Sequence, residues 1–146
     1  EEGLRDTTLP NQRARALMAE AYRLRCAWSH RPISEARGIE IDHAFPWSRW
    51  ANNDLWNLLP TDPKVNQKKS DKLPSAATLQ ASEKIIKDWW EAAWLSTPYR
   101  ERFLSEATTA LPALSESPST DELFNAMRLQ RVRLRADQSL AEWSVR

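Results

Sequence analysis

The feature that most constrains this chain is the stretch from Ile41 to Ser75, IDHAFPWSRWANNDLWNLLPTDPKVNQKKSDKLPS. Asp42 and His43 are adjacent at the end of a strand-like run, and Asn66 follows in a lysine-rich segment. Carboxylate and carboxamide oxygens are ligands that Mg²⁺ accepts, and a histidine can take up a proton near neutral pH. Lysine ammonium groups bind phosphate. One short stretch therefore contains the groups needed to hydrolyse a phosphodiester with one metal ion.

This stretch resembles the HNH endonucleases, which share a ββα-metal motif. The residues that carry the resemblance are Asp42-His43, Pro46, Asn57-Leu58, Asn66 and Lys69. The similarity is greatest to the HNH domains of CRISPR effector nucleases, in which KSD followed by PS recurs and the spacing from Asp-His to the two asparagines is the same. The resemblance covers about a quarter of the chain and implies an endonuclease that cleaves DNA with a metal ion.

The resemblance also implies a role for each of these polar residues. His43 is expected to deprotonate the attacking water, while Asp42 and Asn66 hold one Mg²⁺, for which Mn²⁺ can substitute. Lys69 is expected to help neutralise charge in the transition state. Asn57 is expected to hold the loop and orient His43, although an ordinary turn asparagine is the alternative reading.

Three further lysines near the motif are candidates for contacts with nucleic acid. They are Lys64, Lys68 and Lys72. A charge run such as KKSDK often marks a solvated surface instead, and this reading stays open as the alternative. If these lysines do contact nucleic acid, they would neutralise its backbone phosphates.

The segment around these lysines predicts a helix over residues 63–70. Thr61 or Asp62 can cap it, and a proline stands in its first turn. On this helix Asn66 would direct its amide oxygen toward the aspartate of the motif, and Lys69 would share its face. The helix would therefore bring the second oxygen ligand to the first.

Residues 37–45 alternate between apolar and polar side chains, which predicts a strand. We expect this strand to form a small hairpin with residues 26–30. Glu40 would lie on the same face as Asp42, either as a supporting carboxylate or as a solvated strand residue. The fold class that follows is α+β, with a small ββα-metal HNH core embedded in a mostly helical domain.

Zinc-bearing relatives carry two cysteine pairs around this motif, and the corresponding positions here hold Cys26, Ser29, Asp62 and Val65. One thiolate and a valine cannot form a structural zinc site, so no structural zinc is expected. Tryptophans around the motif are expected to supply a core in its place, since each can bury about 200 Å². These tryptophans are Trp28, Trp47, Trp50 and Trp56. Cys26 is then a small core residue.

The remaining apolar patterns predict helices. They cover residues 10–25, 75–94, 98–112 and 121–143, with a linker over 111–120. The last helix is expected to direct its arginines outward, namely Arg128, Arg131, Arg133 and Arg135. We expect residues 1–75 to form the HNH core with its N-terminal helix, and residues 76–146 to form a helical extension that packs on this core.

The charge of the chain bears on how it reaches DNA. The formal net charge is +1, and non-specific DNA binding depends mostly on neutralising phosphates, so the domain alone should bind DNA weakly. The chain begins with Glu1 rather than methionine, which suggests a processed chain or a domain of a longer protein. We therefore expect a larger protein or ribonucleoprotein complex, of a CRISPR type or another antiviral defence system, to deliver it to DNA.

The composition also indicates a cellular setting, and two other functions stay open. No apolar run is long enough to span a membrane, and the single cysteine fits a protein of the reducing cytoplasm. A catalytically inactive HNH-like fold could bind nucleic acid or a protein partner without cutting. A toxin-type nuclease controlled by an immunity protein is the second alternative.

Overall fold

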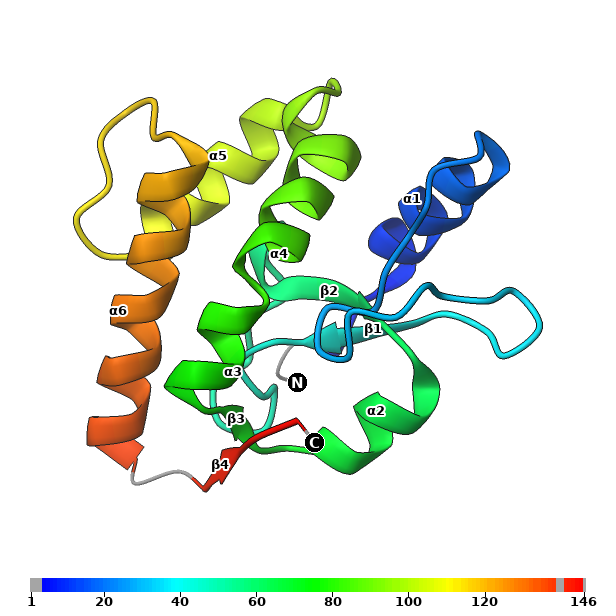
Figure 1. Cartoon of the computed structure of the whole chain (residues 1–146). Coiled ribbons are helices and arrows are strands. Elements are labelled where there is room, and N and C mark those ends of the chain that lie inside the picture. The colour runs from blue at the N-terminus through cyan, green and yellow to red at the C-terminus, as the bar shows by residue number, and fades with distance from the viewer. Residues whose placement is uncertain (1–3, 139–140, 146) are drawn as a thin grey trace.

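The computed structural model describes residues 4–138 and 141–145 (Figure 1). Its helices are α1 (Thr8–Ala19), α2 (Pro63–Lys69), α3 (Ala76–Ala81), α4 (Glu83–Trp90), α5 (Arg100–Ala110) and α6 (Thr120–Gln138). Two short helical turns are η1 (Leu55–Asn57), of the 3₁₀ type, and η2 (Glu91–Leu95), of the π type. The strands are β1 (Glu40–His43), β2 (Leu58–Thr61), β3 (Leu73–Pro74) and β4 (Glu142–Trp143). The predicted α+β class, mostly helical with small sheets, is confirmed.

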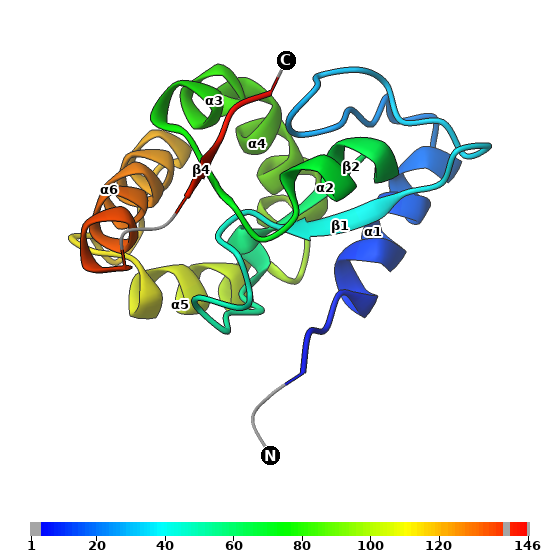
Figure 2. The same cartoon turned by 90° about the horizontal axis from the view of Figure 1, so that it is seen from below.

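The strands β1 and β2 and the helix α2 form the unit on which the site is built (Figure 2). The two strands are antiparallel, with His43 opposite Leu58. The predicted hairpin between β1 and residues 26–30 is wrong, because those residues contact β2 instead, where Ala27 donates its backbone N–H to Pro60 O at 2.9 Å. All four residues of β2 are buried, so β2 lacks the alternation that reveals a half-exposed strand in a sequence.

The helix predicted after this strand pair is confirmed. Asp62 caps α2, and its side chain accepts the backbone N–H of Lys64 at 2.9 Å. Pro63 occupies the first turn, where a missing N–H costs nothing. The helix ends before Ser70, whose φ of 54° belongs to the left-handed region. This short helix lies against β1 and so fixes the position of Asn66 relative to the strand.

The N-terminal helix is shorter than the predicted range 10–25. α1 ends at Ala19, and Ala21 has a φ of 66°, which no α-helix can continue through. The turn redirects the chain so that Leu24 enters the core. The helix itself buries Ala14 and Leu17 and packs against both β1 and β2.

Residues 75–94, predicted as one helix, form α3, α4 and η2 with a break at Ser82. The break coincides with a contact from outside the helix, since the buried hydroxyl of Ser82 lies 3.1 Å from Nε2 of His30. The helix predicted over 98–112 is confirmed as α5, and the loop over 111–120 joins it to α6. α6 runs alongside α3 and α4 (Figure 1).

The last helix also differs from its prediction. α6 ends at Gln138, and Trp143 lies in β4, which pairs in parallel with β3. Residues 139–140 of the predicted helix lie outside the described residues. Arg131, predicted to point outward, is buried, because it lies on the packed face of α6 and donates to Glu142 at 2.7 Å. The other three arginines of that set are exposed.

Tryptophans fill the core. Those exposed by 2% or less are Trp28, Trp56, Trp89, Trp90 and Trp94. Burial of about 200 Å² at about 25 cal/mol per Å² stabilises the fold by roughly 5 kcal/mol for each, as an upper bound. The indole N–H groups of Trp89 and Trp90 donate to Leu58 O and Trp56 O, so α4 is bonded to β2 and to η1. Trp47 and Trp50, by contrast, are only half-buried.

Two residues at the positions of the zinc ligands have other structural roles. Cys26 is fully buried, as predicted, and its Sγ accepts the backbone N–H of Ser29 at 3.5 Å. Asp62 is the cap of α2. In the described part of the chain, no helix combines the length and the apolar character needed to cross a membrane.

Candidate active site

One cavity of about 370 Å³ brings together residues that are far apart in the sequence. Asp42 and His43 reach it from the end of β1, and Asn66 reaches it from α2. The rest of its wall consists of Arg5, Thr7, Ile41, Pro46, Trp47, Ser70 and Asp71. The two predicted metal ligands and the predicted base therefore share one concave surface.

The carboxylate of Asp42 is held through a single oxygen. Its Oδ2 accepts the indole N–H of Trp28 at 2.8 Å and pairs with Nζ of Lys69 at 3.1 Å. The side chain is almost fully buried, at 7% exposure. Because both donors converge on Oδ2, Oδ1 is the oxygen through which Asp42 can bind a further group.

Lys69 lies behind the carboxylate rather than in the cavity. Its side chain is fully buried, and Nζ donates to the backbone oxygen of His43 at 3.1 Å as well as to Asp42. The ammonium also lies 5.8 Å from the centre of the Trp28 ring. In this position Lys69 neutralises Asp42 and anchors the end of β1.

His43 is buried at the cavity wall, with 7% of the residue exposed. Its Nε2 lies 2.8 Å from Oδ1 of Asn53, and its ring packs edge-on against Trp47 at 5.4 Å between centres. Burial lowers the pKa of His43 below 6.5, since it disfavours the charged ring, and this outweighs the hydrogen bond that the ring makes to Asn53 Oδ1 and the charge of Asp42. The imidazole is therefore neutral at physiological pH and able to accept a proton.

Asn57 is fully buried and fastens the loop that follows His43. Its Oδ1 accepts the N–H of Phe45 at 3.0 Å, and its Nδ2 donates to Asn52 O at 3.1 Å. The backbone oxygen of Asn57 accepts the N–H of Ala44. The direct partner of the imidazole is Asn53. This role could not be read from the sequence, because the loop contains two adjacent asparagines and no local pattern distinguishes them.

The carboxamide of Asn66 is oriented by Glu40. Its Nδ2 donates to Oε1 of Glu40 at 2.8 Å, so its own oxygen is directed elsewhere and can bind a further group. Of the two alternatives for Glu40, this bond fits a supporting carboxylate. The strand β1 thus contributes both Asp42 and the group that orients the amide of Asn66.

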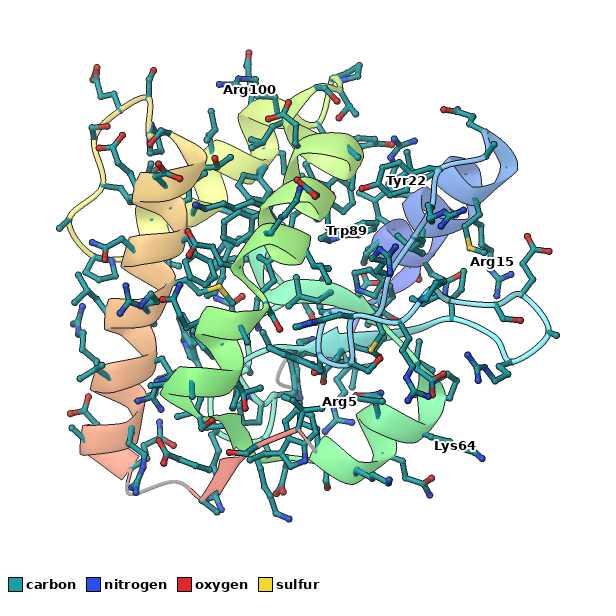
Figure 3. The ribbon with its side chains drawn as sticks, in the orientation of Figure 1. Arg5, Arg15, Tyr22, Lys64, Trp89 and Arg100 are labelled. Carbon is teal, nitrogen blue, oxygen red and sulfur yellow. The ribbon has the colours of Figure 1, made fainter. Side chains whose placement is uncertain are left out.

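The lysines predicted to contact nucleic acid are exposed on and after α2. None of them lines the cavity of His43, and Lys68 and Lys72 line a separate cavity next to β4. In Figure 3 Lys64 points outward from α2. Arg5, by contrast, lines the cavity together with Asp42, His43 and Asn66. Arg5 is the cation on the wall of the cavity, and the sequence offered no signal for it, since it precedes the motif by a long stretch of chain.

The donor set of the cavity agrees with a hard divalent cation. Among residues 4–138 and 141–145, no group of three or more His, Cys, Asp and Glu side chains is close enough to hold a metal ion. The protein would instead offer one carboxylate, from Asp42, and one carboxamide, from Asn66. Mg²⁺ is commonly held in this way, by one or two protein oxygens together with waters and substrate phosphates.

Comparison with known proteins bears on the same stretch. No curated protein matches the chain. Residues 26–75 match the family model described as HNH endonuclease, and these residues include β1, β2, α2 and every predicted site residue. The predicted resemblance is confirmed at the level of this family, while the closer relation to CRISPR effector nucleases stays a prediction. The similarity to HNH endonucleases thus covers residues 26–75 of the chain.

Proposed function

We propose that this chain is a metal-dependent endonuclease domain that hydrolyses DNA phosphodiester bonds, with His43 as the general base. The observation that carries the proposal is the single cavity lined by Asp42, His43 and Asn66. The match of residues 26–75 to the HNH endonuclease model supports the class of reaction. The test is nicking of supercoiled plasmid in the presence of Mg²⁺ or Mn²⁺, by the wild-type chain and by a His43→Ala variant.

In this mechanism His43 removes a proton from the water that attacks phosphorus. The water oxygen bonds to phosphorus as the bond to the 3′ oxygen breaks, and the released 3′ oxygen takes up a proton from solvent water, which leaves a 5′-phosphate and a 3′-hydroxyl. The reaction needs a neutral imidazole at the moment of attack, and the lowered pKa of His43 supplies it at neutral pH. Asn57 keeps the adjoining loop in place, so that the ring stays at the cavity wall.

Asp42 and Asn66 would hold one Mg²⁺, or Mn²⁺, which accepts the same oxygen donors. When bound, the ion polarises the scissile phosphate and stabilises the charge that develops on it. Lys69 keeps the carboxylate of Asp42 in place from behind. Arg5 lies on the cavity wall, where its guanidinium can bind phosphate oxygens in pairs.

Delivery by a larger complex is part of the same proposal. A net charge of +1 leaves little long-range attraction for DNA. The exposed lysines Lys64, Lys68 and Lys72 would contact phosphates of the DNA backbone once the domain is brought to its target. A CRISPR-type or other defence assembly, in which another module selects the sequence, fits a nuclease domain of this charge.

A Glu40→Ala substitution is expected to raise the dissociation constant for Mn²⁺ by about tenfold, because supporting groups that orient a ligand typically contribute that much or more. Without Oε1 of Glu40, the amide of Asn66 can rotate and offer its nitrogen instead of its oxygen. Calorimetric titration with Mn²⁺ measures the effect. Glu35→Ala, which removes an exposed carboxylate before the strand, is the matched control. An unchanged affinity in the Glu40 variant would remove Glu40 from the site.

The rate of cleavage should stay constant as the pH is lowered from about 8 to about 6.5 and fall only below that, because burial lowers the pKa of His43. The free energy of unfolding should also fall as the pH is lowered below about 6.5. Below pH 6.5 the unfolded state binds a proton on this histidine before the folded state does, so protonation favours unfolding until the lowered pKa is passed. Initial rates at constant ionic strength and metal concentration test this, with His30→Gln as control. A half-maximal rate above pH 6.5 would contradict it.

A further inference from the structure

Asn53 joins three groups that no local sequence pattern connects. Its Nδ2 donates to Leu4 O at 2.8 Å, and its Oδ1 accepts the backbone N–H of Asp6 at 3.1 Å. The same Oδ1 lies 2.8 Å from Nε2 of His43. One side chain therefore links the N-terminal segment, residues 4–6, to the imidazole at the wall of the cavity.

The two backbone contacts determine which way the amide of Asn53 faces. A carbonyl oxygen such as Leu4 O can only accept a hydrogen bond, and a backbone N–H such as that of Asp6 can only donate one. With the amide reversed, oxygen would face oxygen and NH₂ would face N–H, and both bonds would be lost. The amide oxygen must therefore be the atom next to Asp6 and His43.

The orientation of the amide in turn determines the tautomer of the histidine. An amide oxygen has no hydrogen to donate, so Nε2 of His43 has to carry the proton in the bond between them. A neutral imidazole carries one proton, and with that proton on Nε2 the lone pair is on Nδ1. The ring nitrogen left to accept a proton is Nδ1.

We infer that Asn53 is a positioning residue that holds His43 as the Nε2–H tautomer, so that Nδ1 is the atom that deprotonates water, and that residues 4–6 keep Asn53 in this orientation. The assignment of the base rests on the proposed function, whereas the tautomer does not. The N-terminal segment, residues 4–6, then contributes directly to the site. It orients the base through Asn53. It also places Arg5, the residue between Leu4 and Asp6 in the sequence, on the wall of the cavity.

The tautomer can be read directly by NMR from the ¹⁵N shifts of the His43 ring in the full chain, at a pH of about 8.5, where this ring is neutral. The chain has two histidines, so the spectrum is simple, and a His30→Gln variant assigns the signals. We expect the His43 Nε2 to show the shift of a protonated nitrogen and Nδ1 that of an unprotonated one. A ring protonated on Nδ1 would overturn the inference without the use of any variant.

Two substitutions of Asn53 separate positioning from mere support of the loop. Asn53→Leu removes the acceptor, so the ring should exchange between tautomers and kcat should fall by about tenfold with KM nearly unchanged, since a general base must be held in register with its water. Asn53→Asp keeps an acceptor for Nε2 and for Asp6, although it replaces the bond to Leu4 O by a repulsive contact between two oxygens, so it should retain the tautomer and most of kcat while loosening residue 4.

The outcomes for this inference and for the proposed function are distinct. If Asn53→Leu keeps both the wild-type tautomer and the wild-type kcat, Asn53 serves only to anchor the N-terminal segment, and the inference is wrong. If the tautomer is as expected but neither Mg²⁺ nor Mn²⁺ supports nicking by the wild-type chain, the endonuclease assignment fails and the tautomer assignment stands.

Discussion

Replacing His43 with alanine should slow plasmid nicking by a factor of about 10² to 10⁴, the usual contribution of a general base. The imidazole is the neutral base on the wall of the cavity, and burial keeps it neutral at the pH of the assay. Asp42 and Asn66 remain in the variant, so the affinity for Mn²⁺ measured by calorimetry should change little. Loss of cleavage with retained metal affinity would assign the chemical step, rather than metal binding, to His43.

The other histidine of the chain provides the matched control for this experiment. His30 lies outside the cavity and contacts Ser82 at the break between α3 and α4. His30→Ala should therefore cleave plasmid at close to the wild-type rate. Circular dichroism of both variants checks that they are folded under the assay conditions. Equal nicking by wild type and the His43 variant would show that another group activates the water.

Replacing Lys69 with methionine should lower the free energy of unfolding by about 3–5 kcal/mol, because removing one partner of a buried ion pair leaves the other charge uncompensated. Both side chains of the pair are nearly inaccessible, at 0% for Lys69 and 7% for Asp42. The substitution also removes the donor to the backbone oxygen of His43. Since a domain is typically stable by only about 5–15 kcal/mol, the variant should be close to unfolding.

Urea denaturation in the presence of EDTA measures this effect without interference from bound metal. Lys68→Met is the matched control, because its side chain is exposed on the same helix and its loss should change stability by no more than about 0.5 kcal/mol. Adding Asp42→Asn to the Lys69 variant removes the uncompensated carboxylate charge and should restore part of the free energy of unfolding. Equal destabilisation by the Lys68 and Lys69 substitutions would mean that the ion pair contributes nothing.

The sequence by itself determined the local features of the motif. Strand alternation predicted β1, and Asp62 and Pro63 predicted the start of α2. These predictions succeeded because alternation and helix capping depend on residues within a few positions of one another. The residue types of the motif also indicated the chemistry, since carboxylate, carboxamide and imidazole have the same ligand and acid–base properties in any fold.

The strand β2 and the break at Ser82 could not be read from the sequence. All residues of β2 are buried, so its pattern matches no half-exposed strand, and its pairing with β1 depends on where the long connecting loop returns. The break between α3 and α4 faces His30, a residue distant along the chain. In both cases the structure depends on a distant residue or strand, β1 for β2 and His30 for Ser82, and a local sequence pattern does not include such a partner.

Only the tertiary structure decided how the site is supported. Lys69, which was expected to help neutralise charge in the transition state, is buried behind Asp42, and Arg5 is a cation on the cavity wall. Asn53, one of two adjacent asparagines, bonds His43 because residues 4–6 pass beside the loop. A side chain's intrinsic chemistry is a property of the residue type and can therefore be read from the sequence. Its burial and its hydrogen-bond partners depend on segments brought together by folding, so they could be known only from the folded chain.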